Sequence, residues 1–131
     1  MVSRDTKVHL AVVALALAGV ALLSQTFGFT DPVAVVGYVL YNGAVLAGAH
    51  LYLAWRGEDG LVPVASRWRF VAAVAVVLSL GGVVALTDSV AMGPVTSDAL
   101  LAGIAGAVAV GYLVVEARDG YLDSRDGDQT T

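Results

Sequence analysis

The sequence predicts an all-α membrane protein, with four transmembrane helices in an up-down bundle and both termini in the cytoplasm. Of the 131 residues, 58% are hydrophobic and only 14% are charged, against about 25% charged in an ordinary soluble domain. Residues 8–30, 32–55, 70–87 and 99–115 contain no Asp, Glu, Lys or Arg. About 20 helical residues cross a hydrocarbon core of about 30 Å. These four segments fill most of the chain, so we expect a single integral membrane domain over 1–131.

The first two helices are predicted over about 8–29 and 32–55. Pro32 is a favoured first residue of a helix, because its missing N–H has no partner there in any case. Thr30 and Asp31 precede it as candidate caps. The charged turn 56–60 ends the second helix.

The last two helices are predicted over about 69–86 and 99–117. Ser66 is a candidate cap for the third helix. The segment 87–98 contains Gly93-Pro94 and two acidic residues, so it is predicted to be a loop. We expect the Asp-rich tail 118–131 to be polar and mobile.

The positive charges predict the orientation. All seven basic residues lie before the first helix, between the second and third, or after the fourth: Arg4, Lys7, Arg56, Arg67, Arg69, Arg118 and Arg125. The other two loops contain only acidic charges. Because cytoplasmic segments carry the excess of Lys and Arg, both termini are predicted to be cytoplasmic. Trp55 and Trp68 fall at the same edge, as residues of an aromatic belt do.

The first helix has an alternative interpretation. Basic residues followed by an apolar run are also typical of a cleaved secretory signal. The run continues past the usual length of a signal and has no clear small-x-small cleavage pattern around Leu22-Leu23-Ser24. We therefore expect the helix to be retained.

Composition excludes several chemistries. The chain has no cysteine, so disulfides, thiolate metal sites and cysteine nucleophiles are absent. A net charge of −4 argues against binding nucleic acid. No glycine-rich phosphate-binding motif is present, and we expect neither a cofactor nor a metal. Arg outnumbers Lys and Asp outnumbers Glu, a halophilic-type composition that resembles that of proteins from salt-loving organisms.

Few polar residues lie inside the predicted helices. Asn42 and Ser79 fall at similar depth in the second and third helices, with Tyr38 and Tyr41 flanking Asn42. Hydrogen bonds between membrane helices average about 0.6 kcal/mol, enough to set their register. We interpret this group as a packing clamp, and a weakly polar path for a small molecule is the alternative.

The cytoplasmic mouth contains residues that could form a titratable cluster, although the favoured interpretation is that His50 only hydrogen-bonds Tyr112 or a backbone carbonyl. His50 and Tyr112 each lie six residues before an arginine, and Glu116 lies one turn beyond Tyr112. Equal depth in neighbouring helices would bring the three side chains together. His9 in the first helix also makes a bis-imidazole haem a less favoured hypothesis.

The fourth helix carries small residues at every fourth position. Ala99, Gly103, Ala107 and Gly111 form this stripe, which would let two helix backbones approach closely. It either closes the bundle or binds a second copy or another membrane protein.

The missing interior charges favour a non-enzymatic accessory, scaffold or partner-binding protein that acts in the lipid bilayer through helix packing. A proton pump or an ion-coupled transporter normally needs at least one intramembrane charge. An oligomeric small transporter or channel is the alternative, and a haem-binding redox protein is a third hypothesis. The sequence names no substrate or partner.

Overall fold

The computed structural model describes residues 3–28, 31–58 and 60–128. Within them lie four helices long and apolar enough to cross a membrane: α1 (Arg4–Thr26), α2 to α3 (Pro32–Trp55), α4 (Val64–Leu86) and most of α5 (Ser97–Asp128). The prediction of four apolar helices is confirmed at this level.

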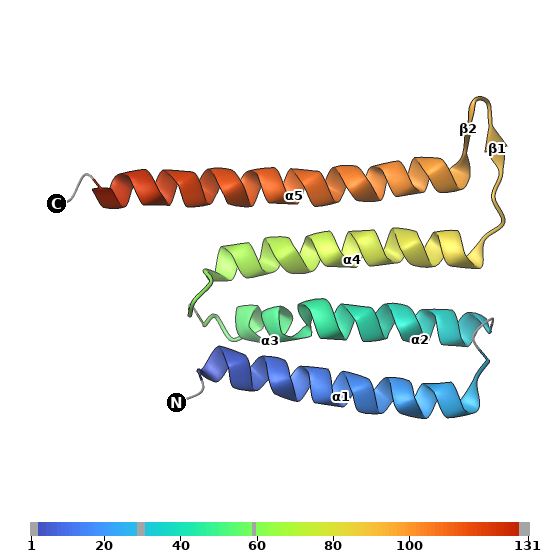
Figure 1. The fold of residues 1–131 in the computed structure, drawn as a ribbon, viewed down its shortest axis with the longest axis horizontal. Coiled ribbons are helices and arrows are strands. Elements are labelled where there is room, and N and C mark those ends of the chain that lie inside the picture. The colour runs from blue at the N-terminus through green and yellow to red at the C-terminus, as the bar shows by residue number, and fades with distance from the viewer. Residues whose placement is uncertain (1–2, 29–30, 59, 129–131) are drawn as a thin grey trace.

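The helices lie side by side in chain order and alternate in direction (Figure 1). α1 packs along the second helix, the second helix packs on α4, and α4 packs on α5. α1 and α5 therefore form the two opposite edges of an open row, instead of the closed bundle that we expected. Since lipid tails are as apolar as leucine, burying the outer sides of α1 and α5 against protein would gain little free energy in a bilayer.

The second helix is interrupted halfway. It consists of α2 (Pro32–Gly43), a π-helical segment η1 (Ala44–Gly48) and α3 (Ala49–Trp55). The predicted bounds 32–55 are confirmed, and Asp31 caps the helix by accepting a hydrogen bond from the Val33 N–H at 2.9 Å. Thr30, the other candidate cap, lies outside the described residues.

Other predicted helix bounds need correction. α1 begins one turn early because Ser3 caps it by accepting from the Thr6 N–H. α4 begins at Val64, so Ser66 lies inside the first turns and is not the N-cap. The predicted tail is also helical as far as Asp128, because α5 continues past residue 117.

The connections follow local turn chemistry. Gly57, with a φ of 65°, ends α3 in the left-handed conformation that suits glycine. Two short strands, β1 (Ala91–Met92) and β2 (Val95–Thr96), form a hairpin within the predicted loop. Gly93, with a φ of 67°, precedes Pro94 in its two-residue turn, which matches a type II′ hairpin.

The buried core is small and lies in the second helix. The buried apolar residues in the described chain are Ala34, Ala47, Ala49, Leu53 and Ala54. Gly48 lets α1 come close, because a Cβ there would lie 2.8 Å from the Val12 Cγ1 atom. This packing holds α1 and α4 on either side of α3.

Candidate functional site

The polar side chains gather at one end of the row. We call it the basic end: it contains the first turn of α1, the connection between α3 and α4, the first turns of α4, and the last turns of α5 (Figure 1). All seven basic residues of the chain belong to these segments. Three polar groups occupy this end in the described part of the chain: one around Arg67, one around Arg69, and the exposed ion pairs of Glu58 with Arg4 and Arg56.

Arg67 is the largest fully buried side chain in the described structure. Its guanidinium donates from Nη2 to the Asp5 Oδ2 atom at 2.8 Å and from Nε to the Val62 carbonyl at 3.0 Å. Its Nη1 atom is buried without a hydrogen-bond partner in the described structure. A charged group this deeply buried needs its counter-ion, so the pair fixes the start of α1 against α4.

Gly60 lies directly over this ion pair. A Cβ at Gly60 would lie 3.1 Å from Asp5 Oδ1 and 3.4 Å from Arg67 Nη2. The absence of a side chain thus lets the α3–α4 connection close over Asp5 and Arg67.

His50 lies beside this pair, between α1 and α4. Its ring meets His9 edge to face, with centroids 5.1 Å apart, and meets Phe70 with centroids 4.8 Å apart. The His9 Nδ1–H donates to the Asp5 carbonyl at 2.7 Å. Because the two imidazoles pack directly on each other, this arrangement leaves no space for a porphyrin between them and does not support the haem hypothesis.

The predicted cluster of His50, Tyr112 and Glu116 is split in two. Phe70 lies between the first two residues, with its ring centroid 5.7 Å from that of Tyr112. Glu116 instead accepts hydrogen bonds from the Ser66 hydroxyl and from the Arg69 Nε atom, the latter at 2.8 Å. The three residues share the basic end, but an aromatic ring that sequence spacing did not reveal separates them.

Arg69 links α4 to the C-terminal part of α5. Besides Glu116, its guanidinium binds the Asp119 carboxylate at 2.8 Å and donates to the Ser66 hydroxyl at 3.3 Å. Asp119 follows Glu116 by three residues, so both carboxylates lie on one face of α5. This three-residue spacing of the two carboxylates is the one feature of the sequence that points to the group around Arg69.

A hollow of about 480 Å³ opens beside Arg69. Its lining includes the apolar residues Leu61, Val62, Pro63 and Leu122. It also includes the polar residues Ser66, Arg69, Glu116, Asp119 and Asp123. The hollow therefore combines charged groups and an apolar surface.

The residues predicted to form a packing clamp between the second and third helices, or alternatively to line a polar path, do not converge. The Asn42 side chain is exposed and donates to the Tyr38 carbonyl of its own helix at 2.7 Å. Tyr41 lines a separate small hollow with Leu23 and Gly37.

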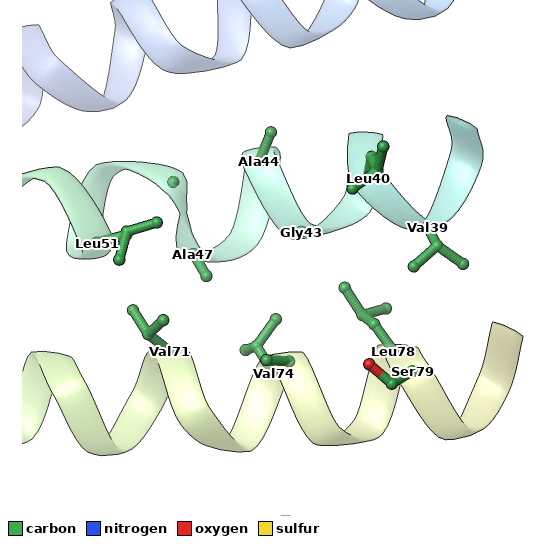
Figure 2. A pocket seen from close by; sticks show the side chains of 12 residues that line it. Val39, Leu40, Gly43, Ala44, Ala47, Leu51, Val71, Val74, Leu78 and Ser79 are labelled. Atoms are coloured by element: carbon green, nitrogen blue, oxygen red, sulfur yellow. The ribbon is translucent and has the colours of Figure 1, made fainter. Parts of the chain in front are cut away.

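Ser79 lines an apolar groove of about 420 Å³ between the second helix and α4. In Figure 2, Val39 and Ala47 point across this groove toward Val71, Val74 and Leu78. Its lining thus offers one hydroxyl among aliphatic side chains and no chain of polar groups.

The small-residue stripe of α5 lies on the surface. Ala99, Gly103, Ala107 and Gly111 are all exposed. A Cβ at Gly103 or Gly111 would meet nothing within 4 Å. Half-buried residues instead recur at Leu101, Ala105, Val108 and Tyr112, a spacing that turns this side of α5 toward α4. Most of the stripe is therefore not packed on α4, although Gly111 lines a small hollow that it shares with Ala72 and Val76 of α4.

The comparisons assign no family: no protein-family model, no curated protein and no solved structure matches the chain.

Proposed function

We propose that this chain is a multi-pass membrane protein without enzymatic activity that acts as an accessory or scaffold, binding another transmembrane helix through α5. The four long apolar helices support a membrane location. The exposed outer side of α5 supports the mode of action.

The orientation proposed places the basic end in the cytoplasm. Every Lys and Arg belongs to this end, while the α1–α2 and α4–α5 connections carry only acidic charges. The positive-inside rule then puts both termini on the cytoplasmic side.

The cysteine-free sequence makes this orientation directly testable. In intact cells, a membrane-impermeant maleimide should label Ser89→Cys in the α4–α5 connection and leave Ser124→Cys near the end of α5 unlabelled. Labelling only Ser124→Cys would reverse the orientation, and labelling both or neither would exclude this four-span arrangement.

A single observation carries the partner-binding role: α5 has one packed side and one open side. Its half-buried residues face α4, whereas Gly103 and Gly106 have open space where a side chain would be. Small residues at a helix surface let a second backbone approach and gain dispersion and hydrogen-bond contacts. A transmembrane helix, from a second copy or from another protein, is the partner that fits this surface.

The test is purification of the tagged full chain from its native membranes in mild detergent. A double substitution, Gly103→Leu with Gly106→Leu, fills the open side of α5. Gly81→Leu in α4 is the matched control, because a Cβ at Gly81 also meets nothing within 4 Å.

We expect a transmembrane partner to copurify in a fixed ratio with the native chain and with the Gly81→Leu variant. The double variant should lose this partner. A differently tagged second copy of the chain tells self-association from a foreign partner. An unchanged partner in the double variant, or the absence of any partner from the native chain, would refute the proposal.

A further inference from the structure

His50 is a titratable side chain that the proposed function does not use. It belongs to α3 and is half-buried, and its Nδ1 atom is buried without a hydrogen-bond partner in the described structure. Its ring packs on His9 of α1 and on Phe70 of α4, with centroid distances of 5.1 and 4.8 Å. The ring is therefore part of the contact that holds α1 against α3 and α4.

Titratable and charged groups face this ring from the other helices. α1 contributes His9 and Asp5, and α4 contributes Arg67. From α5, the ring of Tyr112 lies behind Phe70. The carboxylate among these groups, Asp5, is bound to Arg67 at 2.8 Å. With both imidazoles neutral, the charges of Asp5 and Arg67 balance.

A proton on His50 would add a positive charge that has no counter-ion. Its buried Nδ1 atom would become a donor without an acceptor, and the guanidinium of Arg67 is a like charge beside it. Asp5 is already bound to that guanidinium, and Glu116 of α5 is bound to Arg69 at 2.8 Å. Because an unpaired charge in a buried setting is strongly disfavoured, the packed arrangement requires a neutral His50.

His9 is in a different situation. Its Nδ1–H donates to the Asp5 carbonyl at 2.7 Å, and a second proton on the ring would go to Nε2 and leave this bond intact. The two histidines therefore differ, and the contact between α1 and α3 is sensitive to the protonation of His50.

α1 is free to respond because of its place in the fold. It forms one edge of the open row and packs along the second helix (Figure 1), so its start can move away while α4 and α5 stay packed. His50 lies six residues before Arg56, about 9 Å from the end of α3. Once α1 has moved, the ring is within reach of water and lipid headgroups at the basic end.

We propose that the contact of His50 with α1 is a switch operated by acid: protonation of the His50 ring separates the first turns of α1 from α3 and α4. Because separation takes up one proton, a fall of one pH unit below about 6.5, where free histidine titrates, shifts this equilibrium by up to about tenfold.

The first measurement is the SDS unfolding titration of the purified full chain at about pH 7.5 and about pH 5.5, which bracket the ordinary titration of histidine. His50→Phe and His50→Gln each remove the titrating ring. His9→Phe is the matched control, because it removes the other histidine and keeps an aromatic ring against His50.

The second measurement locates α1 in phosphatidylcholine nanodiscs at the same two pH values. Since the chain has no cysteine, spin labels attach only at Ala11→Cys in α1 and Ala117→Cys in α5, which replace exposed residues. Pulsed electron paramagnetic resonance gives the distribution of distances between the two labels.

We expect acidification to raise the unfolding equilibrium constant of the native chain by about tenfold and to produce a second population of label distances. Both changes should be absent from His50→Phe and His50→Gln and present in His9→Phe.

Three outcomes would overturn the proposal. The first is an acid response in both His50 variants equal to that of the native chain. The second is a response lost only in His9→Phe, which would assign the proton to the other ring. The third is acid sensitivity with unchanged label distances, which would mean that α1 does not separate. None of them depends on a partner of α5, because the purified chain is tested alone.

Discussion

Asp5 and Arg67 are 62 residues apart in sequence, yet their side chains form an ion pair of 2.8 Å in which the arginine side chain has no exposed surface. The pair joins the first turn of α1 to the first turns of α4, across α3. A salt bridge of this kind adds little net stability compared with apolar packing, but breaking one side leaves a buried charge unpaired. The start of α1 and the start of α4 are thereby held together.

Removing the carboxylate should therefore be costly. We expect Asp5→Asn to lower the free energy of unfolding by about 3 kcal/mol, because Arg67 stays charged and buried without its partner. Glu58→Gln, which breaks exposed pairs with Arg4 and Arg56, should cost less than about 1 kcal/mol. Circular dichroism during SDS titration in mixed micelles measures both.

A double variant separates the charge from the packing. Asp5→Asn with Arg67→Met leaves no unpaired charge, so it should be more stable than Asp5→Asn alone. Equal losses for Asp5→Asn and Glu58→Gln would contradict the burial of this pair.

His50 is expected to tolerate an apolar ring. Its Nδ1 atom is buried without a hydrogen-bond partner in the described structure, so His50→Phe removes an unsatisfied polar atom and keeps the contact with Phe70. We expect the unfolding temperature of His50→Phe to equal or exceed that of the native chain. His50→Ala leaves a cavity and should cost about 2–3 kcal/mol. If His50→Phe is as unstable as His50→Ala, the ring nitrogen has a role in the fold.

Two glycines should respond oppositely to alanine. At Gly48 the added Cβ lies 2.8 Å from Val12, whose branched side chain is restricted to few rotamers, so we expect a loss of about 1–2 kcal/mol. At Gly81 nothing lies within 4 Å, and Gly81→Ala should gain about 0.5–1 kcal/mol from better helix propensity. The same unfolding titration checks both signs, and stabilisation by Gly48→Ala would show that α1 packs elsewhere.

The end of α5 should depend on Arg69. Its contacts with Glu116 and Asp119 link α4 to the turn from which the helix continues. We expect Arg69→Ala to speed amide hydrogen exchange over residues 118–125 by about fivefold to tenfold, because an exposed helix end opens easily without tertiary contacts. Arg118→Ala is the control, since Arg118 makes no ion pair in the described chain. Equal exchange in both variants would mean that local propensity alone holds this helix.

Local sequence features predicted the helices but not the side-chain contacts between them. Pro32 and Asp31 begin the second helix as expected, because capping involves neighbours in the chain. Ser66 also has the chemistry of a cap, but its hydroxyl binds Glu116, 50 residues away. The continuation of α5 past residue 117 was not predicted for the same reason. Most of residues 118–128 are polar, and Asp119 forms its ion pair with Arg69, which belongs to another helix.

The polar cluster shows where spacing fails. Counting residues put His50 and Tyr112 at the same depth, but depth alone does not determine which helices are neighbours or how each is rotated. In the open row α4 lies between their helices, and its Phe70 separates the two rings.

The sequence by itself determined that there are four apolar helices and that all positive charge belongs to one end, because hydropathy and charge are properties of continuous segments. Only the tertiary structure decided that the helices form an open row, that Gly103 and Gly106 of α5 face open space, and that Arg67 is buried against Asp5. These features depend on the rotation and order of the helices. Contacts between residues far apart in the chain determine the rotation and the order of the helices. A uniformly apolar segment has no hydrophobic periodicity from which these contacts could be predicted.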